Sequence, residues 1–120
     1  MLPAPLRMRR SEDFALTIRR GARAGRTTLV VHCRLSGDRE GARVGFVVPR
    51  TVGGAVVRNT VRRRLRGVVV EQRGSLPDGA DVVVRVLPPA AGATYATLAD
   101  EFTSALSTAA RRAASAAVRP

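Results

Sequence analysis

The chain has 120 residues, 45% of them hydrophobic, which fits one domain with a real core and excludes a disordered tail. Its net charge of +12, with arginine at all 21 Lys+Arg positions, favours a polyanionic partner, nucleic acid first and an anionic membrane second. No apolar run approaches the ~20 residues that span a bilayer, the first residues lack a secretory signal, and the single cysteine excludes an internal disulfide. We therefore expect a cytoplasmic protein.

The N-terminal part is predicted to contain an arm and a short helix. Residues 1–10 carry two prolines and three arginines and are expected to form a flexible basic arm. Ser11 suits the N-cap of a helix that closes at Gly21, with Phe14 and Ile18 on one face. On this pattern alone, the two side chains are more often core than a platform on which bases stack.

Two alternating segments follow and are predicted to be strands. Residues 27–35 present an apolar face and a partly polar face, and the polar one carries His32. A histidine there is most often a surface residue, although a role in stacking or phosphate binding stays open. Residues 42–48 alternate in the same way, and the polar turn between the segments predicts an antiparallel hairpin.

Residues 55–70 change to a helical period with two contrasting faces. The apolar stripe consists of Val57, Val61, Leu65 and Val68, and the opposite arc of Arg58, Asn59, Arg62, Arg63 and Arg66. Arg64 lies beside the stripe and is expected to snorkel outward. Asn59 is the only asparagine of the chain and a poor helix former, which suggests that its amide donors and acceptor have a function.

The basic arc predicts contact with nucleic acid. Charge runs are usually solvated faces, but exposed helices interleave acids as partners, and residues 50–70 contain no acid. Arginine forks bind phosphate bidentately, which suits the backbone and shape of structured RNA. A DNA recognition helix stays possible, although predicted strands, and not a second helix, flank this segment.

The C-terminal part is predicted to contain one strand and one long helix. Residues 81–87 include the run Val82–Val84, which is typical of a strand buried on both faces. Thr94 is expected to cap the last helix, and the chain from about residue 113 is expected to fray into a flexible tail. The order of helix, two or three strands, helix, strand and helix predicts a small α+β domain, or α/β sandwich.

Catalytic chemistry finds little support in the residues. His32 and Cys33 are adjacent on a strand and point to opposite faces, so they cannot form a dyad. One histidine and no clustered carboxylates leave no metal cage. We therefore expect no catalytic side chain and no metal ion bound by the protein itself.

The segment around the arginine helix resembles the "RNR" segment of the bacterial ribonuclease P protein subunit. The matching residues are Val48-Pro49-Arg50-Thr51-Val52-Gly53-Gly54-Ala55-Val56-Val57-Arg58-Asn59, then Val61-Arg62-Arg63 and Leu65-Arg66. Weaker, collinear similarities lie at residues 9–14, 43–46 and 81–84. The resemblance therefore covers roughly residues 7–110.

The resemblance implies one αβββαβα domain over residues 1–120, with a left-handed crossover through the arginine helix against the usual right-handed rule. It implies binding of a catalytic RNA subunit that uses divalent metal ions such as Mg²⁺, and of precursor tRNA, whose single-stranded 5′ leader lies between the first helix and the sheet. No obligate protein partner is implied. The RNA-binding residues carried over by position are Arg50, Arg58, Asn59, Arg62, Arg63 and Arg66, and the leader-cleft residues are Arg9, Arg10, Phe14, Ile18 and His32.

The chain departs from the family pattern mainly at the leader cleft. Ile18 and His32 stand where members often carry aromatic residues, and Arg85 lies one place before a position that is often basic. A structural RNA-binding protein of the ribosomal type, without a processing role, is the alternative hypothesis, and a DNA-binding module is a third.

Overall fold

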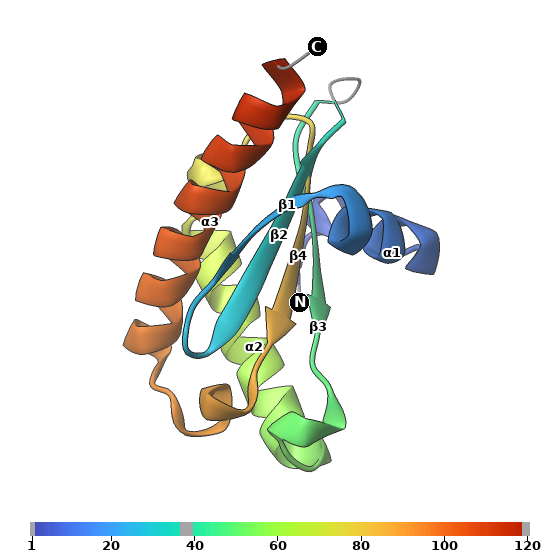
Figure 1. Cartoon of the computed structure of the whole chain (residues 1–120). Coiled ribbons are helices and arrows are strands. Elements are labelled where there is room, and N and C mark those ends of the chain that lie inside the picture. The colour runs from blue at the N-terminus through green and yellow to red at the C-terminus, as the bar shows by residue number, and fades with distance from the viewer. Residues whose placement is uncertain (1, 37–39, 119–120) are drawn as a thin grey trace.

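A computed structural model describes residues 2–36 and 40–118. The described chain forms three α-helices and four strands, with short 3-10 turns between some of them (Figure 1). In chain order they are α1 (Ser11–Arg20), β1 (Ala22–Gly25), β2 (Leu29–Leu35), β3 (Arg43–Val47), α2 (Ala55–Glu71), β4 (Ala80–Val86) and α3 (Tyr95–Val118). This succession confirms the αβββαβα order.

The four strands form one mixed sheet in the spatial order β1-β2-β4-β3. β2 pairs antiparallel with both β1 and β4, whereas β3 pairs parallel with β4. The predicted hairpin between the segments 27–35 and 42–48 is therefore wrong, because β4 lies between them. The central position of β4 explains why the run Val82–Val84 is buried on both faces.

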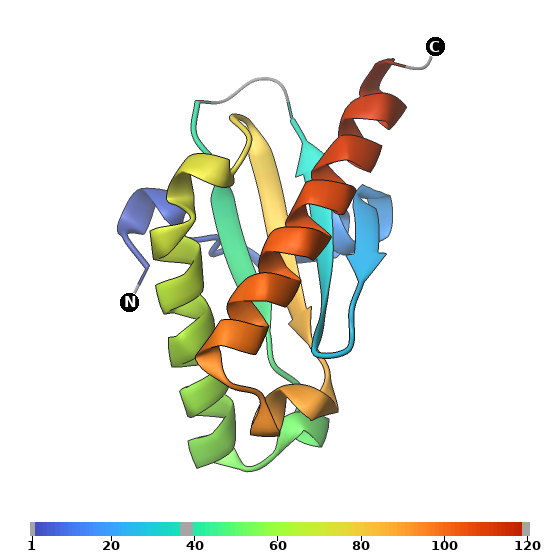
Figure 2. The same ribbon diagram turned by 90° about the vertical axis from the view of Figure 1, so that its left-hand side faces the viewer.

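The helices cover the two faces of the sheet unequally. α2 and α3 lie on one face and α1 lies on the other (Figure 1). In Figure 2, which looks onto the α2 and α3 side, β3 and β4 run downward, β4 lies to the right of β3, and α2 rises in front of them. This path is left-handed, as the resemblance implied and contrary to the common rule for parallel strands.

The core lies between the sheet and the pair α2 and α3. The apolar stripe of α2 enters it, because Val61, Leu65 and Val68 are buried there. Phe102 of α3 is the largest fully buried side chain. Thr94 caps α3 as predicted, since its hydroxyl accepts a hydrogen bond from the Thr97 amide at 3.1 Å.

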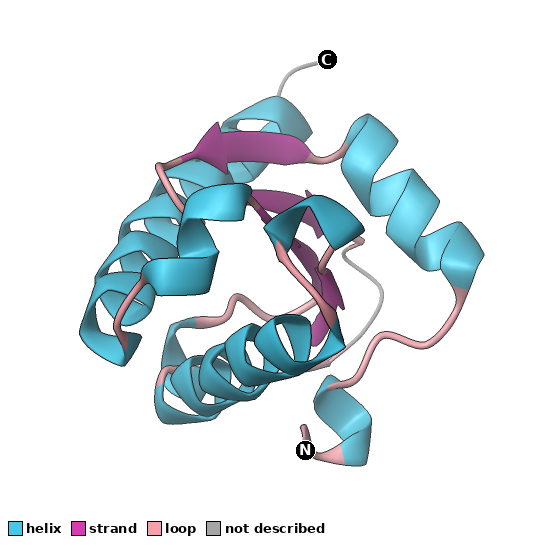
Figure 3. Ribbon diagram, turned by 90° about the horizontal axis from the view of Figure 1, so that it is seen from below, coloured by secondary structure: helices cyan, strands magenta, loops and turns pink. Residues whose placement is uncertain are grey.

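Three local expectations differ from the structure. The N-cap of α1 is Arg10, which makes no side-chain cap bond, so Ser11 is the first helical residue instead. The N-terminal segment buries three apolar side chains, Leu2, Leu6 and Met8, and runs from beside α2 to the start of α1 (Figure 3). α3 continues past residue 113 to Val118 because Ala113 is still buried; residues 119–120 lie outside the described part.

Candidate nucleic-acid interface

The basic face of α2 is the first part of the site. The buried stripe fixes the rotation of the helix, so the opposite arc turns away from the core. Asn59 and Arg63 are exposed on this arc, Arg58, Arg62 and Arg66 are half-buried, and Arg50 is exposed in the turn that precedes the helix. We call these six residues the α2 basic face.

No carboxylate in the described part of the chain neutralises the α2 basic face. Within the described residues, none of its five arginines forms an ion pair. The Nε of Arg58 is buried and has no hydrogen-bond partner there. Because like charges on one arc repel each other, this face is arranged for an anion from outside the chain.

Asn59 orients one of these arginines. Its Oδ1 accepts a hydrogen bond of 3.0 Å from Nη1 of Arg62, one helical turn along α2. Neither an alanine nor an arginine at this position could accept that bond, and the amide nitrogen keeps donors for another group. This contact gives the only asparagine of the chain a physical role.

The second part of the site lies on the α1 side of the sheet, where an ion-pair network holds the helix. Asp81 of β4 is fully buried and receives Arg43 Nε at 3.0 Å, Arg43 Nη2 at 3.1 Å and Arg34 Nη2 at 2.9 Å. The remaining Nη1 of Arg43 reaches Asp13 of α1 at 3.2 Å. The bond to Asp81 raises the pKa of Arg43 above its ordinary value. The network therefore ties α1 to three strands.

A glycine lets α1 approach the sheet closely. A Cβ on Gly45 of β3 would lie 2.3 Å from Cζ of Phe14. Any side chain at residue 45 would push the Phe14 ring away from the strand. Phe14 is thus half-buried against the backbone, and Ile18, one turn later on α1, is also half-buried.

His32 lies on this side of the sheet but not at its surface, so the surface position suggested by the strand pattern is wrong. Its side chain is 2% exposed, and Nε2 accepts a hydrogen bond from Arg85 Nε at 3.4 Å. Burial lowers the pKa of His32, and the charges of Arg85 and Arg23 lower it further. The ring is therefore neutral at pH 7, with its proton on Nδ1, which has no partner among the described residues.

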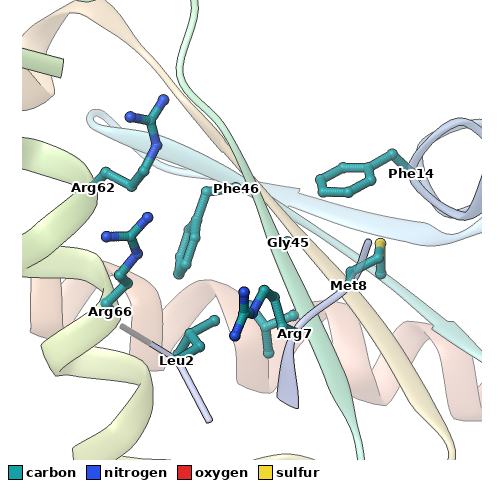
Figure 4. A pocket seen from close by; sticks show the side chains of 9 residues that line it. Leu2, Arg7, Met8, Phe14, Gly45, Phe46, Arg62 and Arg66 are labelled. Carbon is teal, nitrogen blue, oxygen red and sulfur yellow. The ribbon is translucent and has the colours of Figure 1, made fainter. Parts of the chain in front are cut away.

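A cavity of about 210 Å³ joins the two parts of the site (Figure 4). It brings Phe14 together with Arg62 and Arg66, and adds two residues that were not predicted, Arg7 and Phe46. Its remaining lining comes from Leu2, Met8, Val44 and Gly45. We call it the edge pocket, because β3, which contributes to its lining, is an edge strand of the sheet.

Arg9 and Arg10, which were predicted for the leader cleft, do not line the edge pocket. Both are exposed, and Arg10 forms a long ion pair of 3.6 Å with Glu12 whose side chains are 76% and 75% exposed. Such a pair contributes little to stability. No hydrogen bond or ion pair among the described residues connects either arginine to His32.

The sequence and the fold of the chain are both similar to those of one group of known proteins. The Ribonuclease P family matches residues 2–110 of the chain. The chain belongs to the Ribonuclease P family. Among curated relatives, the "Ribonuclease P protein component" of Kocuria rhizophila is 52% identical over 114 residues, covering 95% of this chain and 100% of that protein. The protein of the same name from Streptomyces bikiniensis is 51% identical and covers 88% of this chain and 93% of its own.

Solved structures of Ribonuclease P proteins have the same fold. The RNase P protein from Thermotoga maritima superposes with a TM-score of 0.73 at 27% identity, covering 82% of this chain and 92% of that one. The RNase P protein of Staphylococcus aureus gives a TM-score of 0.78 at 23% identity, covering 87% and 94%. Family membership implies ribonuclease P RNA as a partner of the protein.

Two further properties concern the described residues as a whole. They contain no helix that is both long and apolar enough to cross a bilayer. They also contain no group of three or more His, Cys, Asp or Glu side chains that could hold a metal ion.

Proposed function

We propose that the chain is the protein subunit of ribonuclease P and that the α2 basic face binds the catalytic RNA subunit. One observation carries this assignment: the arginines of that face have no carboxylate partner among the described residues, whereas Arg34 and Arg43 on the α1 side of the sheet do. Guanidinium groups on a rigid helix bind phosphates bidentately and read the shape of folded RNA. Membership of the Ribonuclease P family identifies this RNA as the ribonuclease P RNA.

The α1 side of the sheet is proposed to hold the 5′ leader of precursor tRNA. Phe14 and Ile18 provide an apolar wall there, and Arg85 adds a positive charge next to His32. A single strand binds where aromatic surface and positive charge are combined. The exposed Arg9 and Arg10 supply further charge for its phosphates.

The contribution of the protein to the reaction is electrostatic. Hydrolysis of the phosphodiester before the mature tRNA 5′ end is assigned to the RNA subunit and its Mg²⁺ ions, in the cytoplasm. Two RNA molecules repel each other through their phosphates, and the arginines of this chain offset that repulsion when all three bind. No side chain of the protein is assigned a catalytic step.

Cleavage of precursor tRNA at low magnesium tests this function. The RNA subunit is assayed with and without the protein, on a substrate with a 5′ leader. We expect the protein to stimulate leader removal, and Asp78→Ala, which lies away from both parts of the site, to stimulate equally. No stimulation by the native chain, together with ribosomal RNA as the main RNA that co-purifies with it, would instead support the ribosomal-type alternative.

A further inference from the structure

The edge pocket has the composition of a nucleotide site. In Figure 4, the guanidinium groups of Arg62 and Arg66 from α2 and of Arg7 from the N-terminal segment surround the Phe46 ring. Leu2 and Met8 are both 4% exposed and add apolar surface to the lining. The lining therefore combines an aromatic side chain, apolar surface and positive charge from two separate segments.

The size and charge of the pocket limit what can enter it. A volume of about 210 Å³ holds one flat aromatic ring system but not a base pair. No acidic side chain lines it, and the nearby Asp13 is engaged with Arg43. An anion with one flat, uncharged ring fits these features, and an unpaired nucleotide is such a group.

We propose that the edge pocket receives one unpaired nucleotide of the RNA subunit, with its base against Phe46 and its phosphate between Arg62 and Arg66. This inference rests on the proposed function. Two of the three arginines belong to α2, which places the pocket next to the surface that binds the RNA subunit. The hydrogen bond that Arg62 donates to Asn59 then serves the pocket directly, because it holds that guanidinium at the rim.

A double-mutant cycle on RNA-subunit binding tests the pocket. Phe46→Leu keeps an apolar side chain but removes the stacking face, and we expect it to weaken binding about fivefold. Arg66→Gln should weaken binding by a similar factor. If both side chains hold the same nucleotide, the affinity of the double variant for the RNA subunit should fall by clearly less than the product of the two single-variant factors.

Arg63→Gln provides the matched control, since Arg63 is exposed on the same helix and does not line the pocket. The factor by which Arg63→Gln weakens binding of the RNA subunit should multiply with the factor of Phe46→Leu in the double variant. Multiplicative losses in both cycles would overturn the proposal. Circular dichroism of each variant shows that it is folded. If the native chain fails to bind the RNA subunit at all, the proposed function fails, which is a different result from an uncoupled cycle.

Photocrosslinking identifies which RNA occupies the pocket. The variant Phe46→p-benzoylphenylalanine is assembled with the RNA subunit and precursor tRNA and irradiated. We expect crosslinks to one or a few adjacent unpaired nucleotides of the RNA subunit, weakened when Arg66→Gln is added. Crosslinks confined to the 5′ leader would overturn the assignment to the RNA subunit, and crosslinks scattered over paired regions would overturn the pocket itself.

Discussion

Arginines beneath α1 and arginines on α2 have the same side chain and opposite surroundings. Arg34 and Arg43 share the fully buried Asp81, and Arg43 also reaches Asp13. The arginines of the α2 basic face have no carboxylate partner in the described part of the chain. The first group is paired within the fold, and the charge of the second group is available for the RNA ligand that we propose.

This difference shows how a structural arginine can be distinguished from one that binds a ligand. A buried carboxylate fixes the position of its guanidinium partners. Removing either the carboxylate or a guanidinium group lowers the stability of the folded protein. An unpaired arginine on a helix surface costs the folded state some self-repulsion, and that repulsion is relieved only when a polyanion binds. The two groups should therefore respond in opposite ways to substitution, one through stability and the other through affinity.

The largest effect is expected at the centre of the paired group. Asp81→Ala leaves Arg34 and Arg43 without their shared carboxylate and should lower the free energy of unfolding by about 3 kcal/mol. Urea denaturation followed by circular dichroism measures this change. A loss below about 1 kcal/mol would mean that the network is not a structural tie between α1 and the sheet.

A smaller effect should separate two neighbours on α2. Arg64 donates a hydrogen bond of 2.8 Å to the Ala93 carbonyl, whereas Arg63 is exposed. Arg64→Met should cost about 1 kcal/mol of stability and leave RNA-subunit affinity nearly unchanged, because it removes a bond within the fold. Arg63→Gln should do the reverse. Equal losses of affinity in filter binding would remove the distinction between paired and unpaired arginines.

The smallest effect concerns His32 and pH. Its pKa is lowered by burial, and by Arg85 and Arg23, from the ordinary value of 6.5, so the unfolded chain takes up this proton more readily than the folded one. The free energy of unfolding should therefore fall as pH drops below 6.5 toward the folded pKa. His32→Gln should show a weaker decline when both proteins are unfolded in urea from pH 7 to pH 5. An identical decline would show that other groups cause it.

The sequence predicted the features that depend on neighbours within one helix. The two faces of α2 follow from a 3.6-residue period, and the lack of acids in residues 50–70 is visible without coordinates. The Thr94 cap is equally local. The partner of Arg64 could not be predicted in this way: its guanidinium donates to the Ala93 carbonyl, which lies far along the chain.

Features that depend on strand order could not be predicted from local patterns. The turn after β2 suited a hairpin, yet β4 separates β2 from β3. This order makes β3 an edge strand and brings Phe46 to the edge pocket, and it places Arg85 beside His32. The continuous apolar run Val82–Val84, which the structure buries on both faces, was the sign in the sequence that β4 is a central strand.

β1 could not be predicted from the sequence pattern because of its composition. Ala22–Gly25 contains two alanines and a glycine, residues that are poor in strands, so no alternation marks it. The pattern left open whether two or three strands precede α2, and the family resemblance implied three. The burial of His32 was missed for a related reason, because the strand pattern alone did not show that the α1 side of β2 would be enclosed.

The salt dependence of RNA-subunit binding tests the central claim most directly. The triple variant Arg62→Gln/Arg63→Gln/Arg66→Gln should reduce the slope of log affinity against log salt by about two to three, since each phosphate contact contributes just under one. A control with the same charge change, Arg73→Gln/Arg111→Gln/Arg112→Gln, removes exposed arginines away from that face and should keep the native slope. Equal slopes for the two variants would contradict the account, because they would show that net charge, and not the α2 basic face, binds the RNA.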